Sequence, residues 1–476
     1  MEGEDVALTF AKHIATVDYA TIPKKVAEST KRSILDTLGV MVAGTGIEPG
    51  CRKVVELVKE AGGREESSIL VFGGKVPAMM AAFANGAASH VLNYDDIAPA
   101  SELHPTSPIL PAALAVAERI GGVNGREFIA AVTLGIDLSA RMGRAVIRRD
   151  TEGHKSGWHE TPLFGTFSSA AVAGKLLGLD KDKLADALGI AFFQAAGSIQ
   201  MVESVCGATY HRDAFPAKAG VLSALLAQRG ISGIKDCLQS KNGLYNLYFK
   251  GDYDPSLLTD KLGGRFELLQ MGNRLKPFPV CGTITTYVNA TLDIVREYDI
   301  QPEDIVEIVV SVYNDWTRGL CEPLEKTRRP PDRMAASMSI PFSVATAAAR
   351  RKLNIGSFTP EALKDPVTLA VAQRVKTEFD PEIIASMPIA ARPGTVAIKT
   401  KSGESYSKRV DFAYGHPKNP MTTDDLIEKF RDCTSYAAKP IPKKNIERAI
   451  ELILNLEEVH DIGEVVQLFT SRGRKI

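Results

Sequence analysis

A short stretch of the sequence brings carboxylate, amide and imidazole side chains close together. Asn93-Tyr94-Asp95-Asp96 is followed a few residues later by His104. Two carboxylates near an imidazole can serve as an acid/base pair, and hard oxygens with an imidazole can also ligate a divalent metal ion. Aspartates at such positions also cap helices, so Asp95 and Asp96 have a purely structural alternative.

His104 and His159 share one arrangement, because each immediately precedes an expected helix start. A proline follows His104 directly, while Thr161 and Pro162 are expected as the N-cap and first residue of the helix after His159. Free N–H groups and the positive end of the dipole at a helix N-terminus favour an anion and keep an imidazole neutral. Neutral imidazole is the form that a general base needs, so both histidines are candidate bases. A solvated loop histidine is the alternative for each.

Two further segments carry cationic side chains. Lys276 opens the proline-rich run Lys276-Pro-Phe-Pro-Val-Cys281, where it could fix a substrate carboxylate. Cys281 has no evident thiolate-stabilising partner, so we expect it to be buried and inert. In Thr209-Tyr-His211-Arg212-Asp213, His211 and Arg212 could bind an anion, although a charged surface turn fits the same residues.

The composition limits the classes of protein to which the chain can belong. Its 476 residues contain 57 Lys+Arg and 57 Asp+Glu. A chain with this charge balance is not expected to have the basic surface that binding of nucleic acid needs. The longest run without a charged residue, 76–94, contains proline and amides and is expected to be a buried helix that does not span a membrane. The acidic first residues do not resemble a signal peptide, and six scattered cysteines indicate reduced thiols. We therefore expect a cytoplasmic protein.

The elements that must position these residues change in type along the chain. Up to about residue 272, and again from about 412, apolar residues recur at helical spacing, with three expected helical hairpins that turn at Gly121, Gly178 and Gly230. Between them, alternating β-branched residues predict strands. The fold class is thus mainly α with an α+β second domain: a discontinuous helical domain (1–272 and 412–476) and a smaller α+β lid domain (273–411). Within the lid we expect strands at 306–312, 395–400 and 405–410 and helices at 335–351 and 360–375.

Several ordered motifs resemble the MmgE/PrpD family, which includes 2-methylcitrate dehydratase, cis-aconitate decarboxylase and iminodisuccinate epimerase. The resemblance covers nearly the whole chain. It implies a helical domain built from both ends of the chain, an α+β lid, a homodimer, and a metal-free, cofactor-free site in the cleft. The motifs that carry it are Ile34-Leu-Asp36-Thr-Leu-Gly39-Val-Met-Val-Ala-Gly44, His90-Val-Leu-Asn-Tyr-Asp95-Asp96 with His104-Pro105, Leu110-Pro-Ala-Ala-Leu-Ala115, Lys276-Pro-Phe-Pro-Val-Cys281, Ser339-Ile-Pro-Phe342-Ser-Val-Ala345 and Gly415-His-Pro-Lys-Asn-Pro420.

Carried across to this sequence, the resemblance implies that His104, His159, Lys276, Asp95 and Asp96 are catalytic. The chain departs from the decarboxylase-type pattern at three positions. Asn93 stands where the family has Asp, Thr209 lies near a family Lys, and Phe342 replaces a Tyr. Asn cannot transfer a proton as a carboxylate does, and Phe has no hydroxyl. Asn93, Arg212, His211 and Phe342 are therefore expected to contact the substrate, with His211 and Arg212 replacing the missing lysine.

Three functions fit these residues. The preferred one is a metal-independent lyase of the hydro-lyase type, which removes a proton α to a carboxylate of a small di- or tricarboxylate and expels a β leaving group. An epimerase, an isomerase or a decarboxylase would use the same site, and a non-catalytic carboxylate-binding relative is the third option. The expected partner is the small carboxylate alone, without nucleic acid or membrane. The sequence does not identify the acid.

Overall fold

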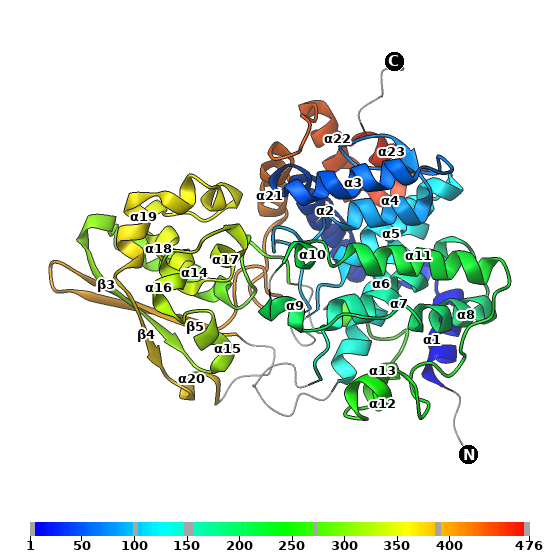
Figure 1. Cartoon of the computed structure of the whole chain (residues 1–476), viewed down its shortest axis with the longest axis horizontal. Coiled ribbons are helices and arrows are strands. Elements are labelled where there is room, and N and C mark those ends of the chain that lie inside the picture. The colour runs from blue at the N-terminus through cyan, green and yellow to red at the C-terminus, as the bar shows by residue number, and fades with distance from the viewer. Residues whose placement is uncertain are drawn as a thin grey trace.

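The computed structural model describes residues 5–98, 103–146, 156–204, 206–269, 274–385 and 392–470. A large helical part and a smaller part that contains a sheet lie side by side, with α21 at their junction (Figure 1). This arrangement is mainly α with a smaller α+β part, which confirms the predicted fold class. The predicted domain boundaries stay a prediction.

The first 260 residues form the bulk of the helical part. A two-stranded antiparallel ribbon, β1 with β2, is inserted between α3 and α4. The elements are α1 (Val6–Thr16), α2 (Lys24–Ile47), α3 (Pro49–Ala61), β1 (Ser67–Ser68), β2 (Lys75–Val76), α4 (Ala78–Gly86), α5 (Thr106–Ile120), α6 (Gly125–Ala145), α7 (Glu160–Leu176), α8 (Lys181–Phe192), α9 (Gln200–Glu203), α10 (Gly207–Tyr210), α11 (Ala214–Gln228), α12 (Leu244–Phe249) and α13 (Ser256–Thr259).

Small residues let the central helices pack closely. Gly220 of α11 lies so near α7 that a Cβ there would meet the Cβ of Ser169 at 2.4 Å. Glu160 to Gly174 of α7 are all buried, which explains why this helix is rich in Gly, Ala and Ser and lacks a polar face. The close packing fixes the N-terminus of α7, which begins directly after His159.

The C-terminal helices join the helical part, with α21 and α22 against α2 and with α23 against α5 and α22. They are α21 (Thr423–Ser435), α22 (Lys443–Leu454) and α23 (Gly463–Gln467), and their apolar residues share one core with α2, α5 and α6. Gly46 near the end of α2 permits this contact, because a Cβ at that position would lie 2.0 Å from the carbonyl oxygen of Tyr436. Segments nearly 400 residues apart in the chain thus form one packed unit.

The lid is a four-stranded sheet in the order β4-β3-β5-β6 with helices against it (Figure 1). β3 pairs in parallel with β4 and antiparallel with β5, and β5 and β6 form a hairpin whose turn contains Gly403 with a φ of 89°. The elements are α14 (Ile284–Glu297), β3 (Ile305–Val312), α15 (Asp315–Gly319), α16 (Leu324–Arg328), α17 (Arg333–Ser337), α18 (Ile340–Arg350), α19 (Pro366–Ala372), β4 (Val375–Phe379), α20 (Glu382–Ala385), β5 (Gly394–Thr400) and β6 (Ser405–Val410).

The structure confirms the predicted strands and corrects several details. The single helix expected at 335–351 is divided into α17 and α18. Ser339 is the N-cap of α18, and its hydroxyl oxygen accepts the Phe342 N–H, so a new helix begins there. The helix expected at 360–375 is only α19, and the strand β4 begins at Val375. A register shift between Ile305 and Glu307 turns Val306 to solvent.

The third predicted helical hairpin is wrong. The chain turns at Gly230 as expected, but residues 231–243 form no helix, and α12 starts only at Leu244. Gly233 instead packs against the backbone of α8, where a Cβ would lie 2.2 Å from the carbonyl oxygen of Asp186. The glycine that suggested a helix restart is therefore required by a close backbone approach.

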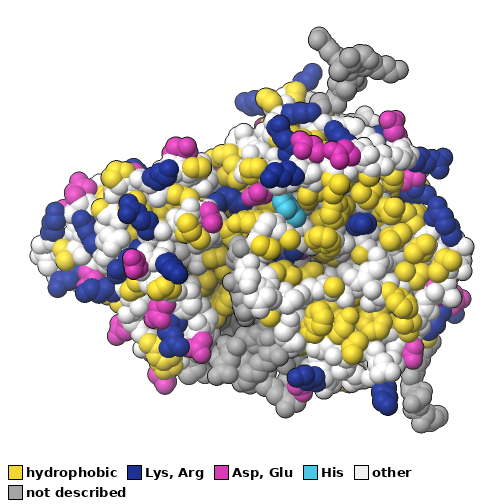
Figure 2. All heavy atoms as spheres, in the orientation of Figure 1, with side chains coloured by type: hydrophobic (Ala, Val, Ile, Leu, Met, Phe, Trp, Pro, Cys, Tyr) yellow, Lys and Arg dark blue, Asp and Glu magenta, His cyan; other side chains and the backbone are white. Residues whose placement is uncertain are grey.

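No helix among the described residues is long and apolar enough to cross a bilayer. Hydrophobic side chains gather on the helical part of the face seen in Figure 2. Phe215 at the start of α11 is 56% exposed, and its ring packs edge-on against Phe83 of α4. This face is a candidate for the contact of the predicted homodimer, which stays a prediction.

Candidate active site

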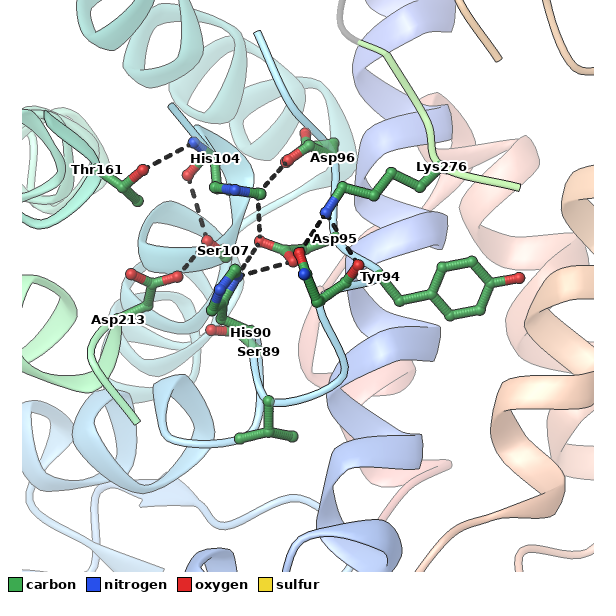
Figure 3. A network of polar contacts seen from close by, with 12 residues as sticks. Ser89, His90, Tyr94, Asp95, Asp96, His104, Ser107, Thr161, Asp213 and Lys276 are labelled. Atoms are coloured by element: carbon green, nitrogen blue, oxygen red, sulfur yellow. Dashed lines mark hydrogen bonds and ion pairs between the residues drawn. The ribbon is translucent and has the colours of Figure 1, made fainter. Parts of the chain in front are cut away.

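One buried carboxylate lies between two imidazoles at the centre of the candidate site (Figure 3). Nδ1 of His90 is 2.9 Å from Oδ1 of Asp95, and Nδ1 of His104 is 3.0 Å from Oδ2 of the same carboxylate. The two rings stand edge to face with their centroids 4.7 Å apart. Asp95 is fully buried and lies in the loop after α4. His104 precedes α5, and only Pro105 separates it from the first residue of that helix.

These contacts fix the tautomer of both rings. Nδ1 of His104 also lies 2.8 Å from the carbonyl oxygen of Asp96, and a carbonyl oxygen can only accept, so Nδ1 carries the hydrogen. The pKa of Asp95 is well below its usual value; burial opposes this shift, and the two histidines overcome it. Its ionised carboxylate likewise requires the hydrogen of His90 on Nδ1. Each ring therefore keeps the lone pair on Nε2, which is the atom able to take a proton.

Burial keeps both imidazoles neutral. It lowers the pKa of His104 to about 4, and burial together with the Arg212 charge lowers the pKa of His90 to about 4. Asp95 acts in the opposite direction on both but does not compensate for the loss of water. Near neutral pH the two Nε2 atoms are thus unprotonated bases.

His159 and Arg212 complete one side of the site. The guanidinium Nη1 of Arg212 is 3.0 Å from Nε2 of His159. Its Nη2 is 3.4 Å from Nδ1 of His90, but this contact brings two donors together, because that nitrogen gives its hydrogen to Asp95. An arginine and a backbone N–H both only donate, so the contacts of His159 with Arg212 and with Thr161 call for a lone pair on each ring nitrogen, and a neutral imidazole satisfies one of them at a time. His159 is itself the N-cap of α7 and faces the N–H of Thr161 at 3.3 Å, which corrects the prediction that Thr161 is the N-cap.

Lys276 lies on the other side and has an amide partner. Its Nζ donates to both the backbone oxygen (2.9 Å) and the side-chain Oδ1 (2.8 Å) of Asn93. Asn93 has a φ of 52°, a left-handed conformation that asparagine tolerates well, and this conformation turns both of its oxygens toward the ammonium. Burial lowers the pKa of Lys276 to about 8, so the side chain stays mainly charged at neutral pH.

The second aspartate of the doublet has a structural role. Oδ1 of Asp96 accepts the backbone N–H of Thr106, and Oδ2 accepts the Thr106 hydroxyl, so Asp96 caps the first turn of α5. The capping alternative thus describes Asp96 and not Asp95. Its predicted catalytic role stays a prediction and gains no support from these contacts.

Two other predicted substrate contacts lie elsewhere. His211 donates from Nδ1 to the carbonyl oxygen of Ala87 at 2.8 Å, and its Nε2 lies over Gly50, at 2.2 Å from where a Cβ would be. Phe342 is fully buried in the lid core, with its ring 6.3 Å from that of Phe358. The cluster therefore unites Asn93, Asp95, His104, His159, Arg212 and Lys276, and the described contacts of His211 and Phe342 lie outside it.

A buried ion pair beneath the cluster holds its two chain segments together. Nζ of Lys429 on α21 is 2.6 Å from Oδ1 of Asp36 on α2, and it donates to the backbone oxygens of Tyr94 and Lys276 at 2.9 Å each. The same ammonium lies 3.7 Å from the centre of the Tyr94 ring. One side chain from the C-terminal helix thereby ties the loop of Asp95 to the segment of Lys276.

Sequence reasoning missed His90, Asp213 and the Lys429–Asp36 pair. Asp213 is fully buried, burial raises its pKa, and it accepts the Ser107 hydroxyl at 2.7 Å beside Arg212. His90 belongs to the same motif as Asp95, and its separation of five residues places both in one tight turn, which was the available signal. Lys429 gave no such signal, because its partners are far away in sequence.

Three residues of the site have the donor types that a metal ion needs. His90, Asp95 and His104 offer ligand atoms that all lie within 4.8 Å of one another. The same Nδ1 atoms are at hydrogen-bond distance from Asp95, and a nitrogen that carries a hydrogen cannot ligate a metal. Hydrogen bonding to Asp95 and metal binding are therefore mutually exclusive uses of the two Nδ1 atoms.

Two models of one protein family match most of the chain. The MmgE/PrpD N-terminal domain matches residues 8–256, and the MmgE/PrpD C-terminal domain matches residues 278–456. The chain belongs to the MmgE/PrpD family. Among similar proteins, cis-aconitate decarboxylase of Homo sapiens is 26% identical over 479 residues, covering 98% of this chain and 94% of the relative. The enzyme of that name from Mus musculus is 27% identical (98% and 93%), and that of Aspergillus terreus is 26% identical (96% and 94%).

The Lys429–Asp36 pair gives a first prediction. Lys429→Met leaves the Asp36 carboxylate buried without its counter-ion, which should cost about 3–5 kcal/mol of unfolding free energy. Chemical denaturation measures this loss. In the double variant Lys429→Met/Asp36→Leu, most of the stability should return, because no unpaired charge remains. A double variant as unstable as Lys429→Met would contradict this account. Arg431→Met, which removes an exposed ion pair on the same helix, is the control.

The triad gives a second prediction. Because Nδ1 of both histidines is engaged as a donor, protein exposed to equimolar zinc and then passed through a desalting column should retain well under one zinc ion per chain. Elemental analysis measures the retained metal. Asp95→Asn should leave this result unchanged. Stoichiometric zinc in the wild-type protein, lost in Asp95→Asn, would show that the triad is a metal site.

Proposed function

We propose that this protein is a lyase that acts on a small di- or tricarboxylate by removing a proton α to a carboxylate and expelling a β leaving group. The observation that carries the proposal is the pair of neutral, Nδ1-protonated imidazoles on Asp95, set between the cations Arg212 and Lys276. Neutral bases between fixed cations suit proton abstraction from a carbon whose carbanion-like charge is spread onto a carboxylate.

In the proposed reaction the substrate carboxylate lies between Lys276 and Arg212. Nε2 of His104 takes the α proton, and Asp95 stabilises the imidazolium that forms. The C–H electron pair becomes the new carbon–carbon double bond. His159, whose Nε2 has first taken a proton from solvent, gives that proton to the departing hydroxyl, which leaves as water. Arg212 must move away from Nε2 of His159 before this step. Binding of the substrate carboxylate to Arg212 would break that contact.

Access to the site requires movement. Asp95 and Lys276 are fully buried, and the exposed fractions of His90, His104, His159 and Arg212 are all below one tenth. A substrate can reach these groups only after residues that cover them are displaced. Exclusion of water around the bound acid would then strengthen its interactions with the two cations.

Decarboxylation is the second candidate, and the names of the similar proteins favour it. The relatives quoted above are cis-aconitate decarboxylases. Loss of carbon dioxide also leaves a carbanion, so Lys276 and Arg212 would stabilise the same charge, while a histidine would donate a proton to carbon instead of removing one. Asn93, which lies in the cluster, differs from the decarboxylase-type pattern, and for that reason we rank elimination first.

The decisive experiment is a proton NMR time course in deuterated water with a panel of di- and tricarboxylic acids, using chelator-treated protein. Elimination of water with solvent exchange of the α proton supports the proposed lyase. Release of carbon dioxide would identify a decarboxylase, and exchange with inversion alone an epimerase. Inertness toward the entire panel at enzyme concentrations near those of the acids would reject an enzyme of this class.

The roles of individual residues give a third prediction. His104→Gln, His159→Gln and Lys276→Met should each lower turnover by about 100-fold or more, because each removes proton transfer or charge stabilisation. The melting temperatures of His159→Gln and Lys276→Met should stay close to that of the wild type, while His104→Gln, which takes a hydrogen-bond donor from the buried Asp95, should melt lower. The control is His460→Gln, since His460 is exposed and distant in sequence from the site. A variant that turns over normally would remove that residue from the mechanism.

The pKa values give a fourth prediction. His104 must be neutral, so kcat/KM should fall as the pH drops through about 4, the pKa to which burial lowers this imidazole. Lys276 must be charged, so kcat/KM should fall as the pH rises through about 8. In Lys276→Arg the alkaline limb should move to higher pH, because a guanidinium holds its proton more tightly than an ammonium. An alkaline limb that stays near pH 8 in this variant would assign it to another group.

A further inference from the structure

A buried arginine near the candidate site has no acidic partner. Arg274 is 3% exposed, its Nη2 donates to the carbonyl oxygen of Gly282 at 2.5 Å, and its Nε has no hydrogen-bond partner. Within the described part of the chain, no carboxylate lies at ion-pair distance from it. An unpaired buried cation is costly, and such groups persist mainly where a ligand supplies the missing charge.

The guanidinium lies at the start of the helix α14. Gly282 directly precedes Thr283, the N-cap of this helix. A second guanidinium is held at the same place, since Nη1 of Arg392 donates to the Thr283 hydroxyl oxygen at 2.9 Å. Trp316 donates to that oxygen at 3.1 Å. Burial and the charge of Arg392 lower the pKa of Arg274 to about 9, which reports two cations held close together.

This arginine pair adjoins the proposed reaction centre. Arg274 is two residues before Lys276, and its backbone pairs with that of Ile97, next to the Asp95-Asp96 doublet. The charge of Arg274 also contributes to the lowered pKa of Lys276, so the two cations are within electrostatic reach of each other. Lys276 itself contacts an amide, Asn93, and no carboxylate neutralises it at ion-pair distance among the described residues.

We propose that Arg274 and Arg392, at the N-terminus of α14, form a subsite for a second carboxylate of the substrate. Two guanidinium groups match the geometry of a carboxylate, and the dipole at the N-terminus of the helix favours an anion there. The proposal rests on the proposed function, because Lys276 and Arg212 hold the carboxylate next to the reacting carbon. It restricts the substrate to acids with at least two carboxylates and excludes simple monocarboxylates.

The test is isothermal titration calorimetry on the full-length, chelator-treated chain. The probes are propane-1,2,3-tricarboxylate, which has no leaving group and is not consumed, butanoate as its monocarboxylate counterpart, and inorganic phosphate. Arg274→Gln and Arg392→Gln should each raise the Kd of the tricarboxylate by about 10-fold or more and leave the Kd of butanoate unchanged. Arg318→Gln, in the neighbouring helix α15, is the matched control and should bind like the wild type.

Three outcomes would overturn the subsite. They are an unchanged Kd for the tricarboxylate, an equal loss for butanoate, and phosphate that binds as tightly as the tricarboxylate with the same arginine dependence. If Arg274→Gln does not fold by circular dichroism, Arg274→Lys, which keeps the charge, and the half-buried Arg392→Gln decide the question. The assay needs no turnover, so arginine-dependent binding without any NMR exchange would reject the lyase and keep the subsite.

Discussion

The carboxylate of Asp95 organises the site, since it accepts a hydrogen bond from each of two imidazoles while fully removed from water. A buried charge of this kind is stable only while its partners remain in place. Both partners are therefore fixed in ring orientation and in tautomer. Because both Nδ1 atoms face Asp95, neither ring can reverse its direction without leaving the charge unsatisfied. The reactivity of the two Nε2 atoms is thus a consequence of how one carboxylate is buried.

Residues that belong to a recognisable local sequence pattern were predictable. His104 and His159 precede helix starts, Lys276 opens a proline-rich loop, and alternating β-branched residues marked β3. Long-range contacts could not be predicted in the same way. Lys429 donates a hydrogen bond to Tyr94, which lies 335 residues earlier in the chain. Arg274 stands out only in the structure, where its Nε is buried without a hydrogen-bond partner. The errors have local causes, as when the Ser339 hydroxyl ends one helix and starts another.

Compared with the aspartate of the decarboxylase-type pattern, Asn93 alters the charge of the site more than its shape. Asn93 holds the Lys276 ammonium with two oxygens, as an aspartate could, but contributes no charge. The positive charge of Lys276 therefore remains available, close to that of Arg274. Lys276 and Arg274 thus place two cations near the buried carboxylate of Asp95 in a chain whose overall charge is zero.

The position of Lys429 in the chain has a consequence for biosynthesis. The histidines, Asp95 and Lys276 all leave the ribosome well before α21, yet the backbone of their two segments is tied together by Lys429 on that helix. During translation the earlier helices can pack before α21 has been synthesised. Asp36 then lacks its counter-ion, Lys429, until that helix is in place. We therefore expect the buried cluster to be completed only after α21 has packed, so that chains truncated before this helix lack its final order.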